Sequence, residues 1–153
     1  MIKVNVLCED YSWTKRIKNK QDLFNQVCKK FPKKYRFPSK KVYLTLLLSN
    51  NNKIKILNKK FRNKNKHTDI LSFPFKDKKK KLKEFYLGDL IISYNYMSKP
   101  KNLSNNEFKK KTIKIFIHGF LHLLGYDHIK NKEYKKMLKQ EQKVFKSVET
   151  LLN

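Results

Sequence analysis

Three of the four histidines in this chain fall within one short segment and could form a metal site. The segment from His118 to His128 reads His-Gly-Phe-Leu-His-Leu-Leu-Gly-Tyr-Asp-His. On a helix of about 3.6 residues per turn, His118 and His122 are one turn apart on the same face. Gly125 then permits a left-handed turn that can bring His128 back as a third ligand. The three imidazoles can therefore converge on one ion.

The donor set indicates which metal and which kind of site. Neutral imidazoles suit zinc, and three protein ligands leave one position open, as in catalytic sites; we expect one Zn²⁺ per chain. Bound water would lose its proton near neutral pH and become a nucleophile. The alternative is that His118 and His122 are core histidines. Each imidazole on this apolar helix would then need its own hydrogen-bond partner, so the spacing favours the metal site.

The same spacing occurs in a class of zinc peptidases, whose pattern is HExxHxxGxxH. The chain matches that pattern except that Gly119 stands where the peptidases have their catalytic glutamate. A peptidase needs this general base, and no downstream segment resembles the Met-turn of the metzincins. Metallopeptidase activity is therefore only a remote alternative.

Hydrophobic periodicity predicts the elements that must position these histidines. Residues 113–124 are apolar on nearly every side, so we expect them to continue a long helix as the buried central helix that carries the metal ligands. Ser104 or Asn105 can cap it, and Gly125 can end it. The other expected strands cover 2–7, 41–48, 69–73 and 86–93, and the other expected helices cover 20–31, the region of Ile54, Leu57 and Phe61, and 132–151. This order predicts an α+β fold in which a small mixed sheet of about four strands packs against helices.

Length and composition predict the organisation of the chain. Its 153 residues suit one domain, 1–153. The N-terminus lacks the apolar core of a secretory signal, and the apolar stretch around His118 is too short to span a bilayer. Cys8 and Cys28 have no metal-binding or disulfide-framework spacing, so we expect reduced, structural thiols. We expect a soluble cytoplasmic protein with no membrane partner.

The charge is strongly positive, with 38 Lys and Arg against 12 Asp and Glu, a formal net charge of +26. Such a field favours a polyanionic partner, most often nucleic acid. A codon bias toward lysine explains the choice of lysine over arginine but not the scarcity of acids. The lysine runs 78–81 and 109–111 read as solvated surfaces that attract phosphate without sequence specificity, and 76–83 as an exposed loop.

Three motifs in order resemble the YbeY family of ribosomal RNA maturation endoribonucleases. They are the histidine segment, residues 57–62 with 68–74, and the Leu-Gly-Asp-Leu-Ile-Ile stretch 87–92. The resemblance runs from about Leu44 to His128. It departs from the family at His67, where proline is frequent, and in the lysine-rich segment after His128.

The resemblance implies zinc bound by His118, His122 and His128, and single-strand-specific RNA cleavage. It implies late processing of the 3′ end of the small-subunit ribosomal RNA and ribosome quality control. The partners would be single-stranded RNA, precursor small-subunit rRNA, and the ribosome or its small subunit. The alternative is a noncatalytic, zinc-stabilised RNA-binding factor for ribosome assembly.

Arg62, one of only three arginines, is the candidate catalytic residue. Its planar guanidinium can hold the scissile phosphate by two hydrogen bonds and stabilise the charge that develops there. The alternative is that Arg62 caps helix carbonyls or pairs with Asp69. For Asp69 and Asp89 we favour structural roles, and Asp127 either supports a ligand or shapes the turn.

Overall fold

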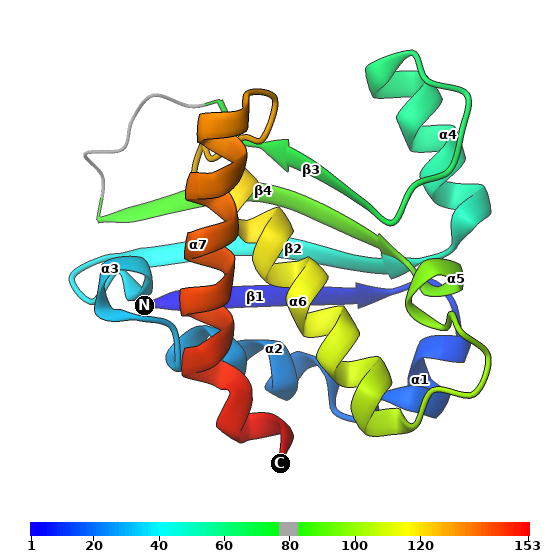
Figure 1. The fold of residues 1–153 in the computed structure, drawn as a ribbon, viewed down its shortest axis with the longest axis horizontal. Coiled ribbons are helices and arrows are strands. Elements are labelled where there is room, and N and C mark those ends of the chain that lie inside the picture. Colours follow the sequence, from blue (N-terminus) through cyan, green and yellow to red (C-terminus); the bar gives the residue numbers. More distant parts are fainter. Residues whose placement is uncertain (77–82) are drawn as a thin grey trace.

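The structure, a computed structural model, describes residues 1–76 and 83–153. Its four-stranded sheet has the order β1-β2-β4-β3 (Figure 1). The three strands β1, β2 and β4 run parallel, and β3 lies antiparallel at the edge beside β4. The strand bounds are β1 Ile2–Cys8, β2 Lys41–Ser49, β3 Ile70–Pro74 and β4 Glu84–Ser93. The predicted α+β fold with a small mixed sheet is confirmed.

The sequence predicted the long helices, but it did not predict α1, α3 and α5, which have four or five residues each. Such single turns are too short to show a hydrophobic period. The helix bounds are α1 Ser12–Arg16, α2 Lys20–Lys29, α3 Lys33–Arg36, α4 Asn51–Arg62, α5 Tyr94–Met97, α6 Asn105–Leu123 and α7 Asn131–Val148, followed by the 3₁₀ turn η1 Glu149–Leu152.

The helices cover the two faces of the sheet unequally. Figure 1 shows α6 and α7 crossing one face, with α1 and α2 beside β1. Side chains alternate along a strand, so Leu90 and Ile92 of β4 face this main core. Ile91 faces the other side, where it packs with Leu71 and with Ile54 of α4. The sheet thus lies between a large layer that contains α6 and a smaller one that contains α4.

The central helix α6 forms as the sequence predicts. Its N-cap is Ser104, whose side chain accepts a hydrogen bond from the Glu107 N–H, while the Glu107 carboxylate accepts one from the Ser104 N–H, a capping box. Phe108, Phe116 and Phe120 are fully buried, so the helix has core contacts along its length. The C-terminal end of α6, with two of the three histidines, is thereby held rigidly against the sheet.

The apolar face of α7 differs in part from the prediction. Met137 and Val144 are buried and Phe145 packs at the edge of the core, as expected. Tyr134 and Leu138, which the sequence assigned to the same face, are exposed. Periodicity alone therefore overestimated the width of the buried stripe.

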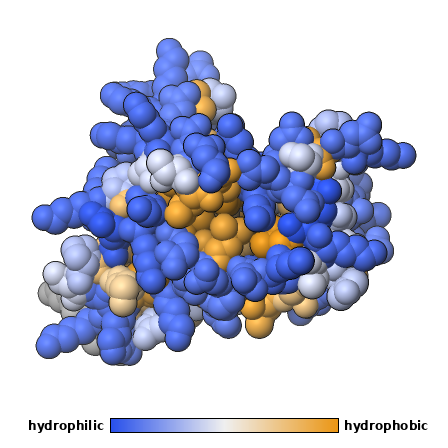
Figure 2. Space-filling view, turned by 90° about the horizontal axis from the view of Figure 1, so that it is seen from below, coloured by the Kyte–Doolittle hydropathy of each residue, from blue (hydrophilic) through white to orange (hydrophobic). Residues whose placement is uncertain are grey.

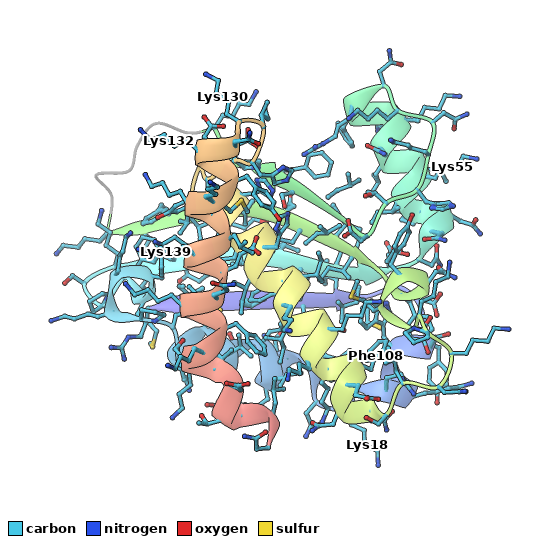
Figure 3. All side chains as sticks on the ribbon, viewed as in Figure 1. Lys18, Lys55, Phe108, Lys130, Lys132 and Lys139 are labelled. Carbon is cyan, nitrogen blue, oxygen red and sulfur yellow. The ribbon has the colours of Figure 1, made fainter. Side chains whose placement is uncertain are left out.

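Lysines cover the surface. The lysines labelled in Figure 3 lie at the periphery of the fold, and Figure 2 shows a largely hydrophilic face around a central apolar patch. Cys8 and Cys28 are free thiols, the first exposed and the second buried. Burial raises the pKa of Cys28, which keeps that thiol protonated. Across 1–76 and 83–153 no helix has the length and hydrophobicity to cross a bilayer. The expected lysine loop 76–83 and the run 78–81 fall mainly outside the described residues.

Candidate metal centre

The structure brings His118, His122 and His128 together. One nitrogen from each ring can be chosen so that all three lie within 4.8 Å of one another. His118 and His122 come from the last turns of α6 and are partly buried, whereas His128 follows the helix and is exposed. The cluster therefore has one open side, toward solvent. Such a site can admit a substrate.

The hydrogen bonds of the rings define which nitrogen atoms are free. The Nδ1–H of His122 donates to the carbonyl oxygen of Tyr126 at 2.9 Å, and a carbonyl can only accept. The Nδ1–H of His118 donates to the carboxylate of Glu141. When both rings are neutral, both Nε2 atoms carry lone pairs, and they face each other at 3.1 Å. Two lone pairs repel at this distance unless a proton or a metal ion lies between them.

This geometry fits a tetrahedral metal ion. Two nitrogen ligands at the usual zinc distance are about 3.3 Å apart in a tetrahedral site, close to the 3.1 Å observed. Burial, together with the neighbouring His118, lowers the pKa of His122. A lowered pKa keeps this imidazole neutral at physiological pH, as a metal ligand must be. The three histidines could therefore hold a metal ion.

The turn after α6 positions His128. Gly125 adopts the left-handed conformation with φ 97°, and the Tyr126 N–H donates back to the Leu121 carbonyl. The Tyr126 hydroxyl reaches the hydroxyl of Tyr35 at 2.9 Å, which ties the turn to α3. Asp127 accepts a hydrogen bond from the backbone N–H of His128. Asp127 thus shapes the turn, one of the two roles that the sequence left open.

Comparison with known proteins identifies the family. The sequence profile described as Endoribonuclease YbeY matches residues 7–149. The chain belongs to the YbeY endoribonuclease family. An "Endoribonuclease YbeY" of Pelagibacter ubique is 59% identical over 150 residues, which cover 98% of each chain. Another, of Persephonella marina, is 36% identical over 70% of this chain and 71% of its own. The predicted resemblance is confirmed.

A solved structure supports the fold of this YbeY family member. The solution structure of a Thermotoga maritima protein superposes with a TM-score of 0.56 at 25% identity, covering 97% of this chain and 89% of the other. The similarity therefore includes the N-terminal and C-terminal segments, which the three sequence motifs did not reach.

The acid that contacts His118 is Glu141, which the sequence analysis missed. The sequence left Asp127 as a candidate for supporting a ligand, and we favoured structural roles for Asp69 and Asp89. Glu141 instead comes from α7, which packs beside α6 and places the carboxylate on His118 Nδ1. The sequence carried one indication that Glu141 has a specific role: acids are few in this chain, and Glu141 lies in a lysine-rich helix.

Replacing Glu141 with glutamine is expected to weaken metal binding about tenfold, because the uncharged amide no longer makes His118 a more basic ligand. Competition with a chelator measures the affinity. Glu149→Gln removes the same charge from the turn after α7, away from the histidines, and should leave the affinity unchanged. Equal affinities for the Glu141→Gln variant and the wild type would show that Glu141 does not support the metal.

Arg62, the last residue of α4, is bonded to the edge strand β3. Its Nη2 donates to the carbonyl of Ser72 at 2.8 Å, and its guanidinium lies over the Phe73 ring. The Ser72 hydroxyl is 3.5 Å from the carbonyl of Gly119, which adjoins His118. Arg62 caps no carbonyl of α4 and makes no ion pair with Asp69 in the described structure. Its other N–H groups remain available to a substrate.

The remaining polar candidates have structural contacts. Asp69 accepts hydrogen bonds from the Ile70 N–H and the Thr68 hydroxyl at the start of β3. Asp89 accepts from the hydroxyl of Tyr86. Both contacts agree with the structural roles we favoured. His67 is exposed, and its Nδ1 lies 2.9 Å from the Tyr96 hydroxyl, outside the histidine cluster.

Gly119 explains why this fold has no place for a peptidase glutamate. A Cβ atom at Gly119 would lie 2.5 Å from Cδ1 of Ile70 and 2.9 Å from Cδ2 of Leu90. Position 119 therefore faces the sheet at the point where α6 approaches it most closely. A side chain there would be directed into the core.

Proposed function

We propose that this protein is a zinc-dependent, single-strand-specific endoribonuclease in ribosomal RNA maturation. Membership of an endoribonuclease family makes RNA its substrate. The observation that carries the metal is the approach of the Nε2 atoms of His118 and His122 to 3.1 Å, with His128 beside them. We assign His118, His122 and His128 as the ligands of one zinc ion per chain.

Each residue has a defined part in the proposed reaction. When bound, zinc supplies Lewis acidity and lowers the pKa of a water ligand toward neutrality. Glu141 and the Tyr126 carbonyl fix the protonation and orientation of His118 and His122. Arg62 uses the N–H groups not bound to Ser72 to contact the scissile phosphate and to stabilise its developing charge.

The charge supports a large RNA partner. The net charge of +26 favours phosphate-rich surfaces in general, and lysines such as Lys130 and Lys132 follow directly after His128. We propose precursor small-subunit rRNA, on the ribosome or its small subunit, as the substrate, with late processing of its 3′ end and ribosome quality control as the role. We place this activity in the cytoplasm and in a single domain.

The second candidate is a noncatalytic assembly factor in which zinc holds the loop after α6 and the basic surface binds RNA. The exposed position of His128 favours the enzyme, because a purely structural zinc site is normally closed by four protein ligands. The remote peptidase alternative has no support, since position 119 is filled by the sheet.

The test of the proposed function combines metal content with cleavage. Mass spectrometry on the purified chain should find about one zinc per chain. The same preparation should cleave precursor small-subunit rRNA and a single-stranded oligonucleotide, and it should spare the matched duplex. A zinc-loaded chain that binds but never cleaves the precursor would favour the assembly factor, and a chain without metal would contradict the proposal.

Replacing Arg62 with alanine is expected to lower kcat for RNA cleavage about a hundredfold, because a donor to the developing charge is lost. Zinc content should not change, since Arg62 contacts no histidine. Arg62→Lys should recover only part of the rate, because one ammonium cannot reproduce the two-point contact. Arg36→Ala removes an exposed arginine of α3 and serves as the control. Equal kcat values for Arg62→Ala and Arg36→Ala would remove Arg62 from the reaction.

A further inference from the structure

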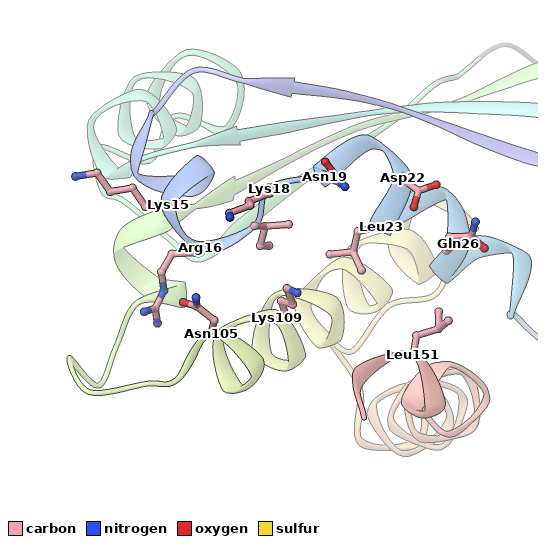
Figure 4. A pocket seen from close by; sticks show the side chains of 11 residues that line it. Lys15, Arg16, Lys18, Asn19, Asp22, Leu23, Gln26, Asn105, Lys109 and Leu151 are labelled. Carbon is pink, nitrogen blue, oxygen red and sulfur yellow. The ribbon is translucent and has the colours of Figure 1, made fainter.

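A cavity of about 440 Å³ opens directly beside the histidine cluster. Its walls come from the start of β3, from α5, and from one face of α6 together with α7. The residues that the argument uses are His118, Glu141, Asp69, Tyr96, Lys111 and Lys114. It is separate from a cavity of about 420 Å³ at the opposite end of α6, which Lys18, Asn105 and Leu151 help to line (Figure 4). Of these two cavities, the first adjoins the histidine cluster.

One wall of this cavity is a fixed aromatic side chain. Lys111 of α6 donates to the backbone carbonyls of Tyr96 and Lys99, which fastens the end of α5 to α6. The Tyr96 hydroxyl contacts His67, so the ring is held at both ends. Tyr96 is half-buried and lines the cavity, and the Lys99 ammonium lies 5.8 Å from the centre of its ring. Aromatic rings of this kind are the usual contact of single-stranded nucleotides.

A second wall carries a cation with no carboxylate partner. Lys114 lies one turn before His118 on the same face of α6, and its side chain is exposed. Its ammonium lies 4.9 Å from the centre of the Phe145 ring. Within the described residues it makes no ion pair, because the nearby Glu141 carboxylate is bound to His118. The flexible lysine stem lets this charge move into the cavity.

We propose that this cavity binds one nucleotide of the RNA, adjacent to the scissile phosphate. Lys114 contacts the phosphate of that nucleotide, and its base packs against the Tyr96 ring. Asp69, which also lines the cavity, repels phosphate and so favours contact of the phosphate with Lys114. The inference rests on the proposed endoribonuclease function and adds a subsite to it. It explains how an RNA strand is positioned along α6 beside the histidines.

The test uses Lys114→Gln, because the side chain is exposed and its loss should not affect folding. KM for a short single-stranded RNA is expected to rise about tenfold, with kcat within about twofold, since one charged hydrogen bond is lost on binding. The slope of log affinity against log salt should fall by about 0.7, the value for one phosphate contact on a single strand. Tyr96→Leu should also raise KM, and Tyr96→Phe should not.

Two lysines provide matched controls. Lys110 also lies over the Phe145 ring, at 5.8 Å, but it does not line the cavity. Lys18 lines the cavity at the other end of α6 (Figure 4). Lys110→Gln and Lys18→Gln should leave KM and the salt slope near the wild-type values. If Lys114→Gln behaves like these controls while the wild type cleaves, the subsite is wrong and the proposed function stands. If the wild type itself does not cleave, the proposed function fails.

Discussion

Replacing His122 with alanine is expected to abolish zinc binding and to lower RNA cleavage about a thousandfold. In the proposed site His122 is one of three ligands, and its Nε2 lies 3.1 Å from that of His118. Loss of the metal removes several kcal/mol of transition-state stabilisation, and each 1.36 kcal/mol corresponds to about a factor of ten in rate. Zinc content by mass spectrometry and initial rates on single-stranded RNA measure both effects.

His67→Ala is the control for the His122 variant. His67 is the fourth histidine of the chain and contacts Tyr96 rather than the cluster. The His67 variant should keep its zinc and its kcat. Circular dichroism should show that both variants are folded, since the core around α6 is formed by its phenylalanines. Normal precursor processing by a metal-free, folded His122 variant would exclude zinc catalysis and support the assembly factor.

Replacing Gly88 with alanine is expected to lower the free energy of unfolding by about 4 kcal/mol, through backbone strain and overpacking together. Gly88 lies in the middle of β4 with φ 139°, a conformation that residues with a Cβ rarely adopt. An added Cβ would lie 2.2 Å from the carbonyl oxygen of Phe73 on the neighbouring strand. That atom belongs to the backbone and cannot move without breaking the pairing of β3 with β4. Urea unfolding measures the loss.

The Gly125→Ala variant distinguishes the cost of backbone strain from the cost of overpacking. Gly125 also has a positive φ, 97°, but no atom lies within 4 Å of the Cβ position. This variant should lose only the conformational part, about 1 kcal/mol. Similar losses for the Gly88 and Gly125 variants would show that the contact with Phe73 relaxes, and that the motif glycine of β4 is needed only for its φ angle.

The sequence by itself determined the histidine site and most of the fold. The spacing of His118 and His122 places them on one helix face, and Gly125 followed by His128 predicts the return of the chain. These are local properties, because helix geometry relates residues four apart without any tertiary contact. The strands and long helices were predictable for the same reason. The ends of the elements were harder to predict. The strand β4 begins at Glu84, two residues before the predicted Tyr86, because pairing with Lys41 extends it.

Only the tertiary structure decided which groups surround the histidines. Glu141 reaches His118 because α7 packs beside α6, and no periodicity links positions 23 residues apart. Arg62 is positioned by the carbonyl of Ser72, an atom with no sequence signature. The cavity beside Tyr96 and Lys114 likewise depends on how α5 and α6 meet. The convergence of the three histidines is encoded locally, whereas the contacts of Glu141, Arg62 and the cavity depend on long-range packing.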